Sequence, residues 1–378
     1  MSIQARVERA LEAAVAAGVP GVAAAVLTPD GEKIEIAAGV RGLDNPAPMT
    51  PDTVFWIASF TKAVTTAAAL ALVEEGRLAL DEPVGERLPL LARPKILRGF
   101  DVDGRPALEA ARTPITLRHL LGHTSGLGYE FCSEALTRYV SVAGPYPQAE
   151  GPDAPLLFEP GSAWTYGVGV DWAGKLIEAA SGEGLDAHLE RRVFGPLGMG
   201  DTSFSPTPEQ RARRASMHTR GANGALAPMA FDMPSPPHFG MGGGGLYSTA
   251  PDYLRFLEAI LADGAPAFSL GVVEAMRSMH WEGREVGVLA SADPQLCAGF
   301  DPFPGRTKRW GLGFLVNLEA GPNGRSAGSL SWAGLGNCYY WADPERGAAG
   351  VFLAQYFPFG DETAFAAFGA FERAVYGA

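Results

Sequence analysis

The sequence is poor in cysteine: its 378 residues include three, Cys132, Cys297 and Cys338, at wide spacing. No two of them form a Cys-x-x-Cys pair, so neither a disulfide framework nor a zinc site is indicated. The chain also lacks any apolar run of the roughly 18 residues that a membrane-spanning helix requires. Its first residues show no basic segment followed by an apolar one, as a secretory signal would. These absences predict a cytoplasmic protein without membrane contact, metal or organic cofactor.

Positive charge is also scarce, because 30 lysines and arginines stand against 42 aspartates and glutamates, for a formal net charge of -12. Nucleic acids and anionic membrane surfaces attract basic patches, so neither is expected as a partner. Hydrophobic residues make up 47% of the chain and charged residues only 19%, which is typical of a well-packed globular protein. A small-molecule substrate is the expected partner, and the oligomeric state stays open.

The hydrophobic pattern predicts a mixed architecture. Apolar residues at helical spacing predict helices over 3–18, 59–75, 170–180, 252–262 and 364–375. Short apolar runs bounded by turn residues predict strands over 22–27, 33–38, 310–318, 337–342 and 350–355. Strands at both ends around a helical middle indicate an α+β fold with one sheet built from both chain ends. We expect a sheet domain from 1–80 and 246–378, a mostly helical domain from 81–245, and an active site between them.

The tetrad Ser-Phe-Thr-Lys at 59–62 opens the second of these helices. Residues three apart share one helix face, so Ser59 and Lys62 stand within reach of each other. A desolvated lysine can take the proton of a serine hydroxyl, and the largely apolar segment 51–58 can bury this one. The alternative is a helix-capping serine beside a solvated lysine. The other lysines of the chain have no serine three residues before them, so the tetrad is unique in this sequence.

Three further segments contain candidate site residues. Tyr166 lies in a loop that opens a helix, where its phenol could move a proton or be a buried ring with a solvated hydroxyl. The run Leu-Ser-Trp-Ala-Gly-Leu-Gly at 330–336 precedes an expected strand. Its glycines suit a hairpin turn, or a backbone that approaches substrate and donates N–H groups to an oxyanion. The segment 115–127 contains His119 and His123, for which we expect a structural role because no carboxylate stands at ligand spacing beside them.

The order of these pieces resembles the serine β-lactamase and penicillin-binding protein superfamily, and most of all its family VIII carboxylesterases. Short sequence segments that resemble this superfamily occur along nearly the whole chain, at 80–84, 116–127, 196–204 and 243–249. The resemblance implies a β-lactamase/transpeptidase-like fold, with an antiparallel sheet flanked by helices and a helical insertion. It further implies Ser59 as the nucleophile, Lys62 as the base and Tyr166 as the proton-transfer partner. The oxyanion hole would consist of the backbone N–H groups of Ser59 and Leu335.

Two positions depart from the β-lactamase pattern. Val168 stands where Tyr-x-Asn has its asparagine, and a valine side chain cannot hydrogen-bond a substrate amide. Trp332 stands where Lys-Thr-Gly has its lysine, so the site loses the cation that would meet a β-lactam carboxylate and gains an aromatic wall. Gly334 would border the substrate at this strand, and Tyr129 could line the pocket or pack in the core. The departures favour hydrolysis of neutral carboxylic esters through an acyl-serine intermediate.

Other activities stay open on the same residues. They are acyl transfer to an alcohol or amine, β-lactam or D-peptide cleavage, and binding of an acyl donor without turnover. The missing lysine at position 332 disfavours lactam and peptide substrates.

Two further motifs are interpreted as inert. The sequence Gly-Arg-Ser-Ala-Gly at 324–328 matches the nucleophile elbow of α/β-hydrolases. It lies between two strand-like segments, where that elbow needs a strand and a helix, and no histidine follows Ser326 to complete a triad in the usual order. The glycines at 242–245 lack the following Gly-Lys-Ser or Gly-Lys-Thr of a phosphate loop and predict close backbone packing near the site.

Overall fold

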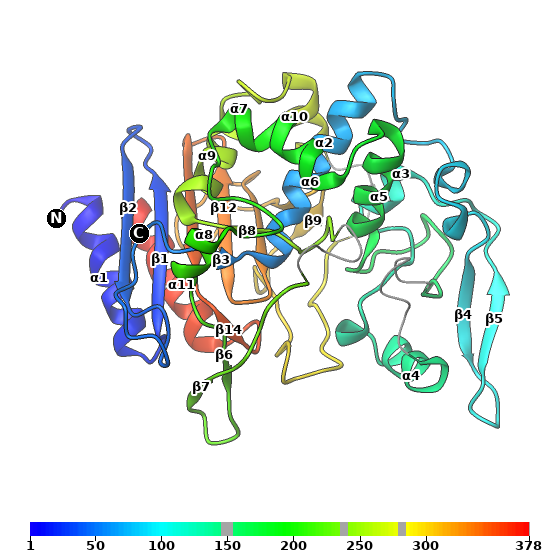
Figure 1. Ribbon diagram of the computed structural model, residues 1–378, viewed down its shortest axis with the longest axis horizontal. Helices are drawn as coiled ribbons and strands as arrows, with labels where there is room; N and C mark the ends of the chain where they lie inside the picture. Colours follow the sequence, from blue (N-terminus) through cyan, green and yellow to red (C-terminus); the bar gives the residue numbers. More distant parts are fainter. Residues whose placement is uncertain (145–153, 235–240, 279–284, 378) are drawn as a thin grey trace.

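The computed structural model describes residues 1–144, 154–234, 241–278 and 285–377. Its largest sheet has seven antiparallel strands in the order β2-β1-β13-β12-β11-β10-β9, with β2 and β1 at the left of the view (Figure 1). Two strands come from the start of the chain, β1 (Gly21–Leu27) and β2 (Lys33–Gly39). Five come from its end, β9 (Lys308–Trp310), β10 (Leu315–Asn317), β11 (Leu330–Gly334), β12 (Cys338–Asp343) and β13 (Ala348–Leu353). The two groups meet where Ala25 of β1 lies opposite Val351 of β13, which confirms a sheet built from both chain ends.

Helices cover both faces of this sheet. Neighbouring residues of a strand point to opposite faces, and in β12 the ring of Trp341 contacts Phe371 while the ring of Tyr340 contacts Tyr253. Phe371 belongs to α11 (Glu362–Tyr376), which packs beside α1 (Ile3–Ala16) on one face (Figure 1). Tyr253 belongs to α9 (Ala250–Leu261) on the other face. The sheet is therefore the middle layer of three.

A largely helical region lies beside the second face. Its central helix is α2 (Thr61–Glu74), whose residues 61–72 are all buried, and α5 (Gly169–Ser181) packs against it. The other α-helices of the described chain are α3 (Leu117–Leu121), α4 (Glu134–Ala143), α6 (Leu185–Leu189), α7 (Gly195–Leu197), α8 (Pro208–Ala212) and α10 (Leu270–Arg277). No described helix is long and apolar enough to span a bilayer.

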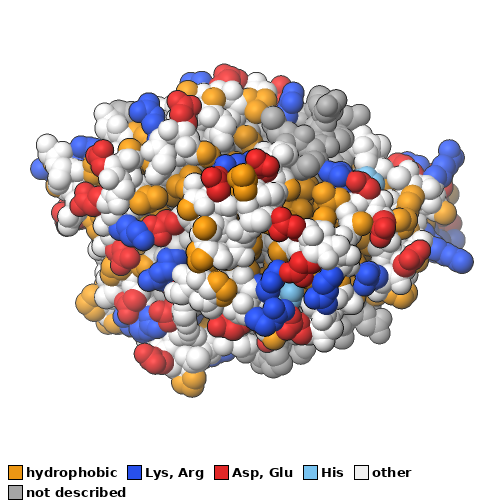
Figure 2. All heavy atoms as spheres, turned by 90° about the horizontal axis from the view of Figure 1, so that it is seen from above, with side chains coloured by type: hydrophobic (Ala, Val, Ile, Leu, Met, Phe, Trp, Pro, Cys, Tyr) orange, Lys and Arg blue, Asp and Glu red, His pale blue; other side chains and the backbone are white. Residues whose placement is uncertain are grey.

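Short strands also occur in the segment 81–245. β4 (Lys95–Phe100) pairs with β5 (Pro106–Ala110), and β6 (His218–Arg220) lies between β7 (Leu226–Pro228) and β14 (Tyr356–Phe357). A further pair joins β3 (Phe55–Trp56) to β8 (Tyr247–Ser248). The division into two domains stays a prediction. On the face shown in Figure 2, acidic and basic side chains lie interspersed among hydrophobic ones.

Two predicted boundaries are wrong, and one strand was not predicted. The strand expected over 310–318 is two strands, because Gly313 has a φ of 95° and the chain turns there. The run at 330–336 precedes a strand, β12, as expected, but its residues 330–334 are themselves the unpredicted strand β11. The helix expected from Ser59 begins as an α-helix only at Thr61, after a 3-10 turn, and so Ser59 does not cap it.

Candidate active site

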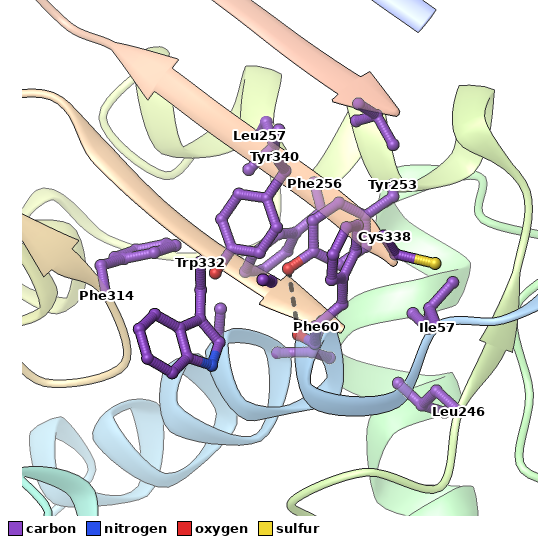
Figure 3. Close-up of a cluster of buried hydrophobic side chains, with 14 of the residues drawn as sticks. Ile57, Phe60, Leu246, Tyr253, Phe256, Leu257, Phe314, Trp332, Cys338 and Tyr340 are labelled. Atoms are coloured by element: carbon purple, nitrogen blue, oxygen red, sulfur yellow. Dashed lines mark hydrogen bonds between the residues drawn. The ribbon is translucent and has the colours of Figure 1, made fainter. Parts of the chain in front are cut away.

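Ser59 is the middle residue of the 3-10 turn η1 (Ala58–Phe60). Phe60 anchors this turn, because its buried ring contacts Tyr253 and Tyr340 at centroid distances of 4.5 and 4.6 Å. The Tyr253 hydroxyl also donates to the Phe60 carbonyl at 3.0 Å (Figure 3). Ala58 has a φ of 46°, a left-handed conformation that costs a residue with a Cβ. The core thus fixes the backbone on either side of Ser59, while Ser59 itself is only half-buried.

Lys62 is fully buried in the first turn of α2. Its Nζ lies 3.1 Å from Ser59 Oγ, 2.9 Å from Tyr129 OH and 2.6 Å from the Gly243 carbonyl oxygen. Burial disfavours the ammonium form and lowers the pKa of Lys62 to about 8, although the neighbouring Asp171 acts to raise it. A neutral amine has two N–H donors and one lone pair. The ammonium form donates to all three oxygens, and once Lys62 has lost a proton with its remaining donors on Gly243 and Tyr129, its lone pair faces the Ser59 hydroxyl, as a base requires.

Tyr166 lies on the other side of Ser59 Oγ. Its hydroxyl donates to Ser59 Oγ at 2.6 Å and accepts a hydrogen bond from the indole Nε1 of Trp332 at 3.1 Å. Burial raises the pKa of Tyr166 above the usual range for tyrosine, so the phenol keeps its proton. Because this single hydrogen points at Ser59, the hydrogen of Ser59 is left for Lys62. Trp332 therefore orients the phenol by a neutral hydrogen bond.

The end of β11 runs alongside the turn that carries Ser59. A Cβ on Gly334 would collide with the carbonyl oxygen of Ile57, so only glycine permits this approach. Leu335 follows directly and is half-buried against the apolar side chains beside the turn. The role of the Leu335 backbone N–H as an oxyanion donor stays a prediction. Val168 is half-buried at the N-cap position of α5, and its role in binding substrate stays a prediction.

Tyr129 has a closer part in the site than the sequence indicated. We expected it to line the pocket or pack in the core, and its hydroxyl is in addition a direct partner of Lys62. Lys62 Nζ also lies 5.1 and 4.8 Å from the ring centres of Tyr129 and Tyr166, within the range of a cation–π contact. The structure thus brings together residues from four separate segments, namely Ser59 with Lys62, Tyr129, Tyr166 and Trp332.

One residue beside Lys62, Asp171, was missed by the sequence analysis. Asp171 is buried in the first turn of α5, and its Oδ1 accepts the Gly243 N–H at 2.9 Å. A Cβ on Gly243 would overlap the Asp171 carboxylate, which explains the close backbone packing predicted for 242–245. The available signal was a carboxylate in the first turn of a predicted helix, among apolar residues. A first-turn aspartate is common at any exposed helix start, so its sequence position alone does not reveal its role.

The remaining motifs serve the fold. His119 closes a capping box with Thr116 at the start of α3. His123 is buried between the rings of Tyr166 and Trp310, and burial lowers the pKa of His123 well below its usual value. Ser326 lies in the connection between β10 and β11, where its backbone N–H donates to Asp343 Oδ2 at 2.9 Å. No helix follows that serine directly, so the nucleophile elbow is absent from this described segment.

Known proteins match this chain along most of its length. A family model described as Beta-lactamase matches residues 7–374. A monacolin J acid methylbutanoyltransferase from Aspergillus terreus is 35% identical over 347 residues, or 87% of this chain and 83% of that protein. A lovastatin esterase from Penicillium rubens is 32% identical over 322 residues, or 80% of each. The solved structure of a simvastatin synthase mutant from Aspergillus terreus has a TM-score of 0.89 and 32% identity, covering 99% of this chain and 97% of that one.

Proposed function

As a member of the beta-lactamase family with the fold of its serine enzymes, this chain is suited to acyl transfer, and we propose that it hydrolyses neutral carboxylic esters through an acyl-Ser59 intermediate. The observation that carries the proposal is the hydrogen-bonded set of Ser59, Lys62 and Tyr166. Trp332 supports the choice of a neutral ester, because it presents an indole where a lysine would attract a carboxylate. Assignment to family VIII carboxylesterases and to the cytoplasm belongs to the same proposal.

Acylation begins when the neutral amine of Lys62 takes the hydroxyl proton of Ser59. The Ser59 Oγ then bonds to the carbonyl carbon of the ester, and negative charge moves onto the carbonyl oxygen. Backbone N–H groups of Ser59 and Leu335 stabilise this oxyanion, each donor contributing on the order of 2.7–4 kcal/mol. When the bond to the leaving alcohol breaks, Tyr166 delivers a proton to the departing oxygen, and the proton held by Lys62 replaces it.

Deacylation reverses these steps with a new acceptor. Water attacks the acyl carbon and loses a proton to the Tyr166 and Lys62 pair, and the carbonyl oxygen again becomes an oxyanion. When the bond to Ser59 Oγ breaks, that oxygen takes the proton back. The products are a carboxylic acid and the enzyme in its starting protonation state.

Transfer of the acyl group to an alcohol is the second candidate. It is supported by the similarity to a methylbutanoyltransferase at 35% identity, beside an esterase at 32%. The residues derived above form the same acyl-enzyme in either case, so the two activities differ only in the acceptor. An added alcohol that diverts acyl product from the acid to a new ester would favour transfer, and an unchanged yield of acid would favour hydrolysis.

Hydrolysis of p-nitrophenyl butyrate by the wild type, Ser59→Ala and Ser326→Ala tests the proposal. We expect Ser59→Ala to lose the activity of the wild type by at least about a thousandfold, because no nucleophile remains. Ser326→Ala is the matched control, a serine-to-alanine change outside the site, and should retain the activity. Turnover that survives in Ser59→Ala would overturn the mechanism.

A further inference from the structure

The carboxylate of Asp171 lies behind the general base and is not used by the steps above. Asp171 and Lys62 hold the two ends of one peptide group, because the Gly243 N–H donates to Asp171 Oδ1 at 2.9 Å and Lys62 Nζ donates to the Gly243 carbonyl at 2.6 Å. A hydrogen bond to the N–H of a peptide polarises its carbonyl and strengthens it as an acceptor. Asp171 thereby fixes one of the two N–H directions of the Lys62 amine.

The second N–H direction is fixed through Tyr129. The Tyr129 hydroxyl accepts from Lys62 at 2.9 Å, and Asp171 lies close enough to this phenol to shift its pKa. Burial and the nearby Asp171 raise the pKa of Tyr129 well above its usual value, so the phenol keeps its hydrogen. Directed at the Asp171 carboxylate, that hydrogen would leave the lone pair of Lys62 free. Directed at the lone pair, it would compete with Ser59 for the base.

Asp171 also offsets part of the cost of burying a positive charge at Lys62. Burial raises the pKa of the Asp171 carboxyl, whereas Lys62 and the Gly243 N–H act to lower it. Among the charged groups that raise the pKa of Lys62, Asp171 has the largest effect. Within the described residues, the other titratable groups facing Lys62 are Cys132 of the turn η4 (Glu130–Cys132), and the buried Tyr129, Tyr166 and His123. Burial raises the pKa of Cys132 to about 12 and lowers that of His123, so both are uncharged at neutral pH.

We propose that Asp171 is the positioning residue of the Lys62 base: it orients both hydrogen-bond partners of the amine and balances the ammonium formed when Lys62 takes the Ser59 proton. This inference rests on the proposed function, since it assigns a partner to the base of that reaction. It also explains the glycine at position 243, where a side chain would displace the carboxylate. No substrate contact is required of Asp171.

The test measures how fast Ser59 is labelled by a fluorophosphonate, with the labelled residue identified by mass spectrometry. The Ser59 oxygen bonds to phosphorus and fluoride leaves. The labelling rate therefore reports the activation of Ser59, whatever the native ester is. In the wild type the rate should rise with pH around 8, where Lys62 loses its proton. In Asp171→Asn the midpoint should fall by about one pH unit or more, because an opposite charge near the ammonium has been removed. The plateau rate should fall at least about tenfold, because the base is weaker and no longer oriented.

Two variants separate charge from general damage. Asp252→Asn removes another buried carboxylate, which lies in the first turn of α9 and accepts the Asp201 N–H at 2.8 Å. This variant should leave the midpoint and the plateau of the labelling rate unchanged. Asp171→Glu keeps the charge but moves it, so its midpoint should stay near the wild-type value while its plateau falls. Asp171→Glu also keeps the proposal testable if Asp171→Asn does not fold. A wild-type midpoint and plateau in Asp171→Asn, or a lowered midpoint in Asp171→Glu, would overturn the proposal. A wild type not labelled at Ser59 would overturn the proposed function, and the inference with it.

Discussion

Ser59 Oγ lies between a buried amine and a buried phenol, and the two have opposite tasks. Lys62 has its pKa lowered to about 8, which makes a neutral acceptor available, whereas the pKa of Tyr166 is raised, which keeps a donor available. Desolvation causes both shifts, because it disfavours the charged form of each group. The same desolvated surroundings therefore favour the neutral base Lys62 and the protonated acid Tyr166 beside one oxygen.

This arrangement predicts the pH dependence of ester hydrolysis. Lys62 accepts a proton only when neutral, so kcat/KM for p-nitrophenyl butyrate should rise as pH passes about 8 and level off above it. It should not fall near the ordinary pKa of tyrosine, about 10, because Tyr166 stays protonated there. Initial rates across this range, corrected for spontaneous hydrolysis, provide the measurement. A rate that is flat through pH 8 would mean that Lys62 is not the titrating base.

At the residue scale the sequence was most informative about chemistry that depends on spacing. Ser59 and Lys62 lie three apart, and the hydrogen bond expected from that spacing is present. Tyr166 and Trp332 were identified by resemblance, and the structure brings them into one hydrogen-bonded chain. Asp171 was not identifiable, because its role depends on a peptide 72 residues away along the chain.

At the scale of elements, glycines decide how closely the segments approach the site. Gly334 lets β11 pass the carbonyl of Ile57, and Gly243 makes room for the Asp171 carboxylate in the first turn of α5. Gly313 turns the chain and splits a segment that the apolar pattern presented as one strand. Hydrophobic periodicity indicates which face of a helix or strand is buried, but it does not indicate where a glycine lets two backbone segments touch. This is why strand positions were less accurate than helix positions.

The same reasoning predicts the effect of a methyl group within the sheet. Gly350 of β13 lies opposite Trp341 of β12, whose indole occupies the space that a Cβ would take. Gly350→Ala should lower the free energy of unfolding by about 1–3 kcal/mol, because the ring or the strand must shift in a packed core. Urea unfolding followed by far-UV circular dichroism measures this change. Gly200→Ala is the control, since a Cβ there meets open space. Equal loss in both variants would contradict the packing explanation.

At the scale of the whole molecule, distant parts of the chain form one site. Ser59 comes from the 3-10 turn that precedes α2, and Lys62 from α2 itself. Tyr129 and Tyr166 come from the middle of the chain, and Trp332 from a strand near its end. The sheet makes this possible because β1 pairs with β13, so both chain ends are held in one layer behind the site. The mixed fold and this closure were predictable from the strand signals at both ends. The small hairpin β4–β5 was not, because its strands are short and its β5 strand is largely exposed.

The central claim is that these segments act together to place an acyl group on Ser59. The most direct measurement is the intact mass of the protein, quenched in acid during turnover of p-nitrophenyl butyrate, followed by peptide mapping. The account predicts a mass increase equal to one butyryl group, located on the peptide that contains Ser59 and absent from Ser59→Ala. A butyryl group on another residue, or turnover with no covalent species under conditions where hydrolysis of the acyl-enzyme is rate-limiting, would contradict it.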